Sequence, residues 1–325
     1  MNIEGKTIFI SGGTGSWGQE LTRQLLKHNP GQITIFSRGE IAQVAMERTF
    51  NDSRIRFVIG DVRDYDAVAE AIQGAEYVYH LAALKHVPIC ENVPFEAIQT
   101  NILGTKNLIN ASLAGGVEKF IDVSTDKAVS PVNTYGFTKG MGERLSIQAN
   151  CRSKYTDFIC IRGGNVLGTN GSVVPYIIDQ IKRGEVYITD SQMTRFFLTL
   201  KQAIHLLFEA TDLGVGGETF VMNMPSFYIK DLVEILVEHY GSGTQITEIG
   251  KREGEKTHEV LIAEGEVDRT RYVDGNYYVI YPEVKTGRIY PERLKAELPA
   301  LGFSSAVNLK DKTYLRELLK QGGWL

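Results

Sequence analysis

The stretch KTIFISGGTGSWG, residues 6–18, decides the fold of this 325-residue chain. Its first six residues form a short β-rich run, and residues 19–28 after it have the spacing of an amphipathic helix. Between them lie three glycines in a G-x-x-G-x-x-G spacing, which lets the backbone approach a pyrophosphate at the helix N-terminus. A glycine triplet alone also forms ordinary turns, but its place between strand and helix predicts dinucleotide binding. The predicted cofactor contacts in this loop are Gly12, Thr14, Gly15, Ser16, Trp17 and Gly18.

Strand-like and helix-like segments alternate over the first half of the chain. Strands are predicted at residues 32–36, 55–59, 77–81, 120–124 and 157–162, and helices at 40–50, 65–72, 94–114 and 135–151. This alternation implies βαβ units, so we predict an α/β fold with a doubly wound, mostly parallel sheet of Rossmann type. The nucleotide-binding domain is expected at 1–162, with a returning segment near 195–222. A smaller, interleaved α+β substrate domain is expected over 163–325.

Composition excludes several classes of protein. The net charge is −4, so the basic field of a general nucleic-acid binder is absent. No apolar run approaches the ~20 residues of a membrane span, and a strand that begins almost at residue 1 leaves no room for a signal peptide. Three cysteines and six histidines lack the spacing of a metal site or a disulfide framework. We therefore expect a cytoplasmic protein without a metal.

The end of the second predicted strand bears on the choice of cofactor. A carboxylate there would bind the ribose 2′-hydroxyl of NAD, whereas a basic residue would bind the 2′-phosphate of NADP. The sequence has Ser37 and Arg38 at this place, and Glu40 comes two positions late, where it favours the start of the next helix. A solvated loop charge is the alternative for Arg38, but NADP is the better prediction. Asp61 and Val62, after the third strand, are expected near the adenine, although Asp61 also suits a plain turn.

Two short motifs carry candidate acid–base chemistry. Tyr135 and Lys139 stand at i and i+4 on one face of a predicted helix, where an ammonium would lower the pKa of the phenol. Asp126 and Lys127 follow the fifth strand, and the carboxyl ends of parallel strands are where such sheets bind ligands. An acid beside an amine can divide the roles of proton donor and acceptor. A surface ion pair is the alternative, which becomes less favourable when both motifs accompany the phosphate loop.

At these residues the chain resembles the extended short-chain dehydrogenase/reductases, and within them the nucleotide-sugar 4,6-dehydratases that act on UDP-N-acetylglucosamine. The similarity extends up to about Tyr281. The strings ALKHVP at 83–88 and STDKA at 124–128 are its most specific parts. The other matching stretches are 12–18, 37–38, 60–64, 80–82, 100–105, 135–139, 164–166, 193–197, 254–256 and 258–259.

The resemblance implies a redox-neutral elimination with NADP, which yields a 4-keto-6-deoxy sugar for polysaccharide or pseudaminic-acid-type biosynthesis. Tyr135, assisted by Lys139, would take the C4 hydroxyl proton, with Thr125 bonded near O4. Lys127 would remove the C5 proton, and Asp126 would protonate the departing C6 hydroxyl. Leu81 would contact the cofactor, Lys85 the cofactor or the substrate, and the remaining implied substrate contacts are Asn165, Arg195, Arg252 and Glu255. A homo-oligomer built on the helices at 94–114 and 135–151 is also implied.

Two departures from the family pattern affect the expected product. Gly163 stands where the family has a tyrosine, and Asn170 where it has a basic residue. Inversion at C5 is the prediction; C5 retention and release of a 5,6-ene are the alternatives within the same class. A non-catalytic NADP-binding regulator is the alternative from another class, but such a protein would lack the two intact motifs.

Overall fold

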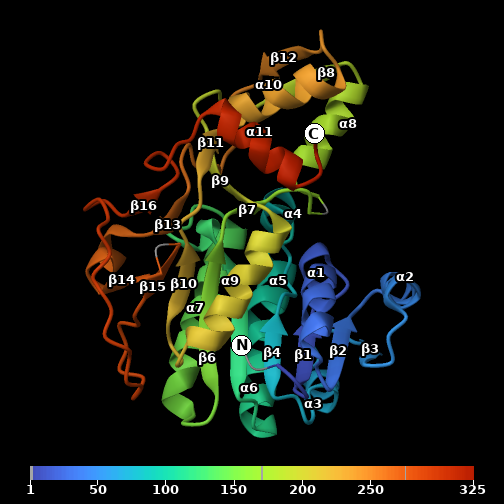
Figure 1. The fold of residues 1–325 in the computed structure, drawn as a ribbon, viewed down its shortest axis with the longest axis vertical. Helices are drawn as coiled ribbons and strands as arrows, with labels where there is room; N and C mark the ends of the chain where they lie inside the picture. The colour runs from blue at the N-terminus through green and yellow to red at the C-terminus, as the bar shows by residue number, and fades with distance from the viewer. Residues whose placement is uncertain (1–2, 170, 275) are drawn as a thin grey trace.

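The computed structural model describes residues 3–169, 171–274 and 276–325, and its centre is a nine-stranded sheet (Figure 1). The strands are β1 (Thr7–Ser11), β2 (Gln32–Ser37), β3 (Ile55–Ile59), β4 (Tyr77–His80), β5 (Lys119–Thr125), β6 (Asp157–Gly163), β10 (Thr219–Met222), β14 (Thr270–Val273) and β15 (Tyr277–Ile280). Their spatial order is β14-β15-β10-β6-β5-β4-β1-β2-β3. The pairs from β3 to β10 are parallel, and β15 and β14 then add two antiparallel pairs. The predicted α/β, doubly wound fold is therefore confirmed.

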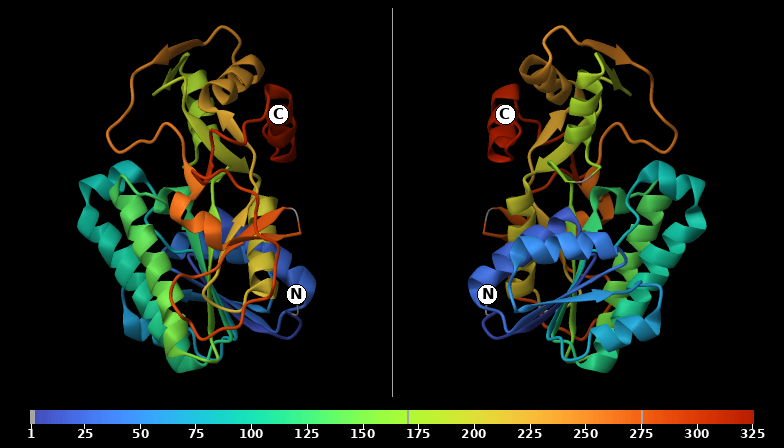
Figure 2. Two further views of the ribbon diagram at one scale, coloured as in Figure 1. Left: turned by 90° about the vertical axis from the view of Figure 1, so that its left-hand side faces the viewer. Right: turned by 90° about the vertical axis from the view of Figure 1, so that its right-hand side faces the viewer.

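Helices cover both faces of the sheet, as Figure 2 shows from two sides. Apolar side chains alternate between the faces: Ile8 and Ile10 of β1 point to one core cluster, and Phe9 between them points to another. The first cluster lies beneath α1 (Ser16–Leu25) and α9 (Leu200–Leu213). The second lies beneath α3 (Tyr65–Ala71) and α6 (Gly104–Gly115), with α7 (Thr134–Ala149) beside them. Burial on both faces explains why these strands are continuously apolar.

The helix predicted at 94–114 is interrupted. It consists of α5 (Pro94–Ala97), the π-helical segment η2 (Ile98–Leu103) and α6, and a short helix that was not predicted, α4 (Val87–Asn92), precedes it. The wider turns of a π-helix occur where a side chain has a special position. Here Asn101 is buried, accepts a hydrogen bond from Leu84 N at 2.8 Å, and donates to Leu84 O at 2.9 Å and Thr138 Oγ1 at 3.0 Å. The interruption thus anchors the loop after β4 to α7.

A second lobe lies beyond the carboxyl ends of the strands, at the top of Figure 1. It packs a separate apolar cluster that includes Ile177, Leu236 and Leu318. Its elements are α8 (Val173–Lys182), β8 (Glu185–Ile188), α10 (Ile229–Tyr240), β12 (Gln245–Glu248) and α11 (Lys312–Gln321). Small sheets join it to the main sheet through β7 (Asn165–Val166), β9 (Thr194–Leu198), β11 (Ser226–Tyr228), β13 (Val260–Ile262) and β16 (Phe303–Ser304). None of the described helices is both long and apolar enough to cross a bilayer.

Candidate active site

A cavity of about 970 Å³ opens at the carboxyl ends of the central strands, and most of the predicted site residues line it. Sixteen of them do so: Gly12, Thr14, Gly15, Ser16, Trp17, Ser37, Arg38, Asp61, Val62, Leu81, Lys85, Thr125, Lys127, Tyr135, Lys139 and Asn165. Five predicted residues are not part of the lining: Gly18, Asp126, Arg195, Arg252 and Glu255. One continuous cavity therefore brings together the phosphate loop and both acid–base motifs.

The glycine loop fits a dinucleotide because its backbone has no room for side chains. Gly12 has a φ of +69°, and a Cβ there would lie 2.8 Å from the backbone of Ala82. A Cβ on Gly18 would lie 2.2 Å from Gly13 O, which explains why Gly18 belongs to the motif without lining the cavity. Gly15 is the N-cap of α1, and the first turn of that helix has no acidic residue. A helix N-terminus of this kind attracts the negative charge of a pyrophosphate.

The end of the cavity near the carboxyl end of β2 is basic, but its positive charge is partly neutralised. Arg38 is exposed, and its Nη1 lies 3.9 Å from Asp61 Oδ2. Arg63 binds that carboxylate more closely, with Nη2 2.7 Å from the same oxygen. Burial acts to raise the pKa of Asp61, but the hydrogen bonds from Arg63 outweigh it, so the pKa is lowered. Arg38 is consequently held beside an ionised carboxylate and still exposes its guanidinium at the end of β2.

The Tyr–Lys pair begins α7, and a carboxylate lies behind it. Asn133 caps this helix by accepting a hydrogen bond from Gly136 N at 2.8 Å, which fixes Tyr135 in the first turn. Lys139, one turn later, is 2% exposed, and its Nζ donates to Asp122 Oδ1 at 3.2 Å. Asp122 was not predicted from the sequence, although a carboxylate between the apolar residues Ile121 and Val123 of a strand was a visible signal.

The pKa of Tyr135 is raised overall, contrary to the expectation that Lys139 brings it toward neutrality. Burial is the largest cause and acts upward, while Lys139 and then Lys127 act to lower the pKa. Burial also acts to lower the pKa of Lys139, but Asp122 outweighs it, so the ammonium is retained. Lys139 therefore acts on the pKa of Tyr135 in the predicted direction, downward. Its effect is smaller than that of burial, so the pKa does not fall.

Asp126 and Lys127 form an ion pair directly after β5. Lys127 Nζ donates to Asp126 Oδ1 at 3.0 Å, and Thr125 Oγ1 donates to the same oxygen at 3.1 Å. The carboxylate is fully buried, and its Oδ2 accepts no hydrogen bond from the described part of the chain. Burial acts to lower the pKa of Lys127, but Asp126 and then Glu259 outweigh it, so the pKa is raised. In this pair the Lys127 ammonium is the hydrogen-bond donor, and Asp126 Oδ2 is an acceptor without a partner among the described residues.

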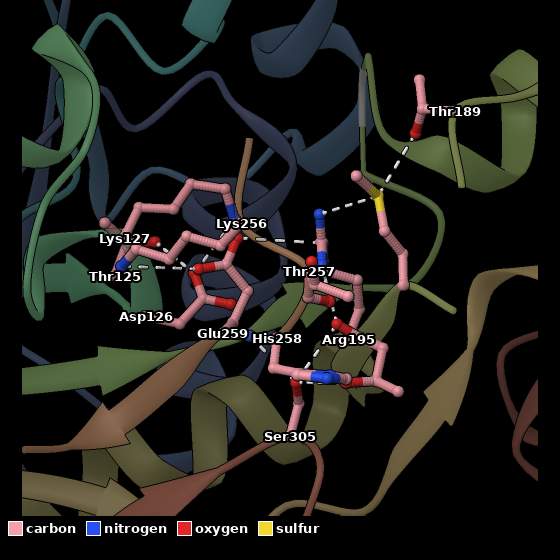
Figure 3. Close-up of polar contacts among 12 residues, drawn as sticks. Thr125, Asp126, Lys127, Thr189, Arg195, Lys256, Thr257, His258, Glu259 and Ser305 are labelled. Carbon is pink, nitrogen blue, oxygen red and sulfur yellow. Dashed lines mark hydrogen bonds and ion pairs between the residues drawn. The ribbon is translucent and has the colours of Figure 1, made fainter. Parts of the chain in front are cut away.

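The predicted substrate residues outside the lining divide into two groups. Arg195 is buried and reaches toward the ion pair: its Nη1 donates to Thr194 O at 2.8 Å, and its Nε lies 3.8 Å from Glu259 Oε1 (Figure 3). Arg252 is exposed, and Glu255 Oε2 accepts a hydrogen bond from its backbone N at 3.3 Å. Their loop contacts the start of α7, because Gly254 O accepts a hydrogen bond from Asn133 Nδ2 at 3.0 Å.

Trp17 lies where a side chain at position 163 would point. A Cβ added to Gly163 would lie 3.7 Å from Trp17 Cη2, and both residues line the cavity. The indole would therefore be in ordinary van der Waals contact with a side chain at position 163. Asn170, the second departure from the family pattern, lies outside the described residues.

Comparisons with known proteins agree with this geometry. A family model described as "Polysaccharide biosynthesis protein" matches residues 8–281. A UDP-N-acetylglucosamine 4,6-dehydratase (inverting) of Campylobacter jejuni is 42% identical over 87% of this chain and 85% of its own length. A UDP-glucose 4-epimerase of Rickettsia prowazekii is also 42% identical, over 84% of this chain and 82% of its own.

Among solved structures, the X-ray structure of Pen from Bacillus thuringiensis is similar over 100% of both chains, with a TM-score of 0.93 and 37% sequence identity. The glycine loop and the two acid–base motifs of this chain all lie within the matched residues 8–281. The chain belongs to the polysaccharide biosynthesis protein family and has the extended short-chain dehydrogenase/reductase fold.

Proposed function

We propose that this protein is an NADP-dependent UDP-N-acetylglucosamine 4,6-dehydratase that inverts C5. The observation that carries the proposal is the Asp126–Lys127 ion pair, 3.0 Å long, whose lysine shares the cavity with Tyr135 and Lys139. An oxidation at C4 needs only a base such as Tyr135. A second acid–base pair beside it matches an elimination, which needs one group to remove a proton and another to protonate the leaving hydroxyl.

In the proposed reaction each residue handles one proton. Tyr135 takes the proton of the C4 hydroxyl while Lys139 stabilises the phenolate, and Thr125 binds near O4. A bound nicotinamide supplies hydride acceptance from C4 and hydride return to C6. Lys127 removes the C5 proton made acidic by the C4 ketone, and Asp126 protonates the C6 hydroxyl so that it leaves as water. After the hydride has reached C6, a solvent-derived proton adds to C5 from the opposite face. We assign substrate binding to the part of the chain after residue 162 and to Lys85. The individual residues are Lys85, Asn165, Arg195, Arg252 and Glu255.

The relatives support two reactions on nucleotide sugars, dehydration and epimerisation. The Campylobacter dehydratase supports a dehydration of UDP-N-acetylglucosamine, whereas the Rickettsia epimerase matches with the same identity and supports a nucleotide sugar in general. An epimerase has no hydroxyl to expel, so the buried acid Asp126 beside Lys127 favours the dehydratase. The same pair argues against a non-catalytic regulator.

The contact between Trp17 and Gly163 supports a second candidate product, a 5,6-ene. The family tyrosine would bring a phenol to the cavity at position 163, and here an indole without a comparable acid occupies the adjacent space. A site with one proton donor fewer beside the sugar favours a 5,6-ene product, for which the hydride would return to C4 instead of C6, Tyr135 would return the proton to O4, and C5 would take up no proton. C5 retention remains the third possible outcome.

The first test is proton NMR of UDP-N-acetylglucosamine incubated with the purified protein in D2O without added reductant. A new C6 methyl signal with deuterium at C5 supports the proposal, and the ring couplings report whether C5 is inverted. Vinyl protons in place of the methyl signal support the 5,6-ene. An unchanged spectrum with cofactor bound contradicts a dehydratase acting on this sugar.

The NADP preference rests on Ser37 and Arg38 at the end of β2, where an NAD enzyme would have a carboxylate. Arg38→Ala should weaken the binding of adenosine 2′,5′-bisphosphate by roughly tenfold or more and leave ADP binding unchanged, because only the former has a 2′-phosphate. Calorimetric titration measures both constants. Arg56→Ala, at an exposed arginine of the neighbouring strand β3, is the control. Equal affinity of the unmodified protein for both ligands would mean that NADP is not preferred.

The proposed homo-oligomer is supported by an exposed apolar surface. Apolar side chains gather along α4, α5 and α7, among them Ile89, Phe95, Phe137 and Met141. A helix-to-helix contact with a second copy would cover this surface.

We also propose a cytoplasmic location. All three cysteines are unpaired, as is usual for proteins of the reducing cytoplasm.

A further inference from the structure

Glu259 is a buried carboxylate that has no role in the proposed reaction as described above. Its side chain is 3% exposed, and three cations surround it (Figure 3). Lys127 Nζ lies 3.5 Å and Arg195 Nε 3.8 Å from its Oε1, and Lys256 Nζ lies 3.9 Å from its Oε2. Oε2 accepts no hydrogen bond from the described residues. Glu259 is therefore held by charge rather than by a saturated set of hydrogen bonds.

The backbone of Glu259 is fixed from a distant part of the chain. Its N donates to Ser305 Oγ at 2.9 Å, and Ser305 N donates to its carbonyl at 2.8 Å. Ser305 Oγ in turn lies 2.6 Å from Thr194 Oγ1, which also contacts His258 Nδ1 at 2.8 Å. Segments before β13, at β9 and after β16 thus position one carboxylate beside Lys127.

The charge of Glu259 matters most at the moment when Asp126 is neutral. In the proposed elimination Asp126 carries the proton for the C6 hydroxyl, so it gives little stabilisation to an ammonium at that stage. Lys127 becomes an ammonium as it takes the C5 proton. Glu259 is then the carboxylate that remains within 3.5 Å of its Nζ.

We propose that Glu259 is a positioning residue for Lys127: it holds the amine at the cavity and stabilises the ammonium that forms when the C5 proton is removed. This inference rests on the proposed function. The other charged or titratable groups that face the pair are Asp126, Tyr135, Arg195 and Lys256. Because Arg195 and Lys256 are cations, they act against the Lys127 ammonium, and Glu259 offsets them.

Glu259→Gln tests the charge while keeping the shape of the side chain. Loss of the carboxylate should lower the pKa of Lys127, so that more of the amine is neutral at any given pH. Trace labelling of the full chain with acetic anhydride, read by peptide mass spectrometry, should then modify Lys127 roughly tenfold faster at fixed pH, which corresponds to one pKa unit. Glu253→Gln, at an exposed glutamate of the same loop, is the matched control and should label like the unmodified protein. An unchanged Lys127 labelling rate in Glu259→Gln overturns the proposal.

Turnover gives an independent readout. On the high-pH plateau of kcat, where Lys127 is neutral in both proteins, the weaker base should slow C5 proton removal by up to roughly tenfold and make this step limit the rate more strongly. The primary isotope effect with C5-deuterated UDP-N-acetylglucosamine should therefore increase in Glu259→Gln, with KM unchanged. A lower kcat without a larger isotope effect means a merely structural role and overturns the proposal. If the unmodified protein does not turn over this sugar, the proposed function fails, yet the labelling result still decides whether Glu259 controls Lys127.

Lys256→Gln tests the same cluster if Glu259→Gln does not fold. Removing this cation leaves the carboxylate of Glu259 to Lys127 and Arg195, so Lys127 should label more slowly than in the unmodified protein. Unchanged labelling in this variant contradicts a charge cluster centred on Glu259.

Discussion

Lys127→Met should lower turnover of UDP-N-acetylglucosamine by roughly 10²–10⁴-fold, the range that loss of a general base produces. Methionine keeps the length of the side chain and removes the amine that Asp126 and Glu259 bind at 3.0 and 3.5 Å. In the proposed reaction, oxidation at C4 depends on Tyr135 and Lys139, which the substitution does not alter. The block should therefore fall on the C5 proton, and UDP should bind with unchanged affinity.

Two measurements separate this outcome from general damage. NMR in D2O follows the entry of deuterium at C5, and calorimetric titration with UDP measures binding by the same sample. Lys201→Met, at an exposed lysine of α9, is the control and should turn over normally. Retention of more than half of the activity in Lys127→Met would exclude Lys127 as the base.

The parts of this site that local sequence predicts are those in which one element carries the whole motif. The phosphate loop connects β1 directly to α1, and Tyr135 and Lys139 share the first turns of α7. Parallel strands bring their carboxyl ends to one edge of the sheet, so the Asp126–Lys127 pair was expected at the same cavity. For these motifs, the periodicity of short segments was sufficient to predict their place in the fold.

The parts that were missed depend on contacts between distant segments. Glu259 reaches Lys127 across 132 positions of sequence, through backbone bonds to Ser305 that no local pattern indicates. Trp17 and Gly163 were each singled out in the sequence, but the contact between them was not predicted. The π-helical turn at Asn101 likewise serves a bond to the loop at Leu84. Such features are tertiary, and propensity carries no information on them.

A buried ion cluster joins the sheet to the C-terminal part of the chain, and its loss should have the largest effect on stability. Arg162 of β6 donates to Glu143 Oε2 at 2.9 Å, to Glu266 Oε2 at 2.7 Å and to Leu261 O at 3.0 Å. All three charged side chains are largely buried. Arg162→Met should therefore lower the free energy of unfolding by about 3–5 kcal/mol, because two buried carboxylates lose their cation.

The pH dependence of this loss has a definite sign. Burial acts to raise the pKa of Glu266, but Arg162 outweighs it, so the folded-state pKa is below the usual 4.5. The stability that this carboxylate contributes is present above that value and is lost as the pH falls through the folded pKa. Without Arg162, only the hydrogen bond from Ala263 N and the charge of Arg269 oppose the effect of burial on Glu266. Its pKa should therefore be higher than in the unmodified protein, and the variant should be relieved as the carboxyl takes up a proton. The difference between the two proteins should thus be largest at neutral pH and should narrow toward about pH 4.

Denaturant-induced unfolding at neutral and at acidic pH measures this difference. Arg144→Met is the matched control: its guanidinium is 67% exposed and lies 3.8 Å from Glu283, so its loss should change the free energy of unfolding by no more than about 1 kcal/mol. A cost that does not depend on pH would indicate lost packing of the arginine stem instead of unpaired carboxylates. Because Glu266 lies in the segment that precedes β14, the ion cluster then also explains how strands from the end of the chain are held to the edge of the nucleotide-binding sheet.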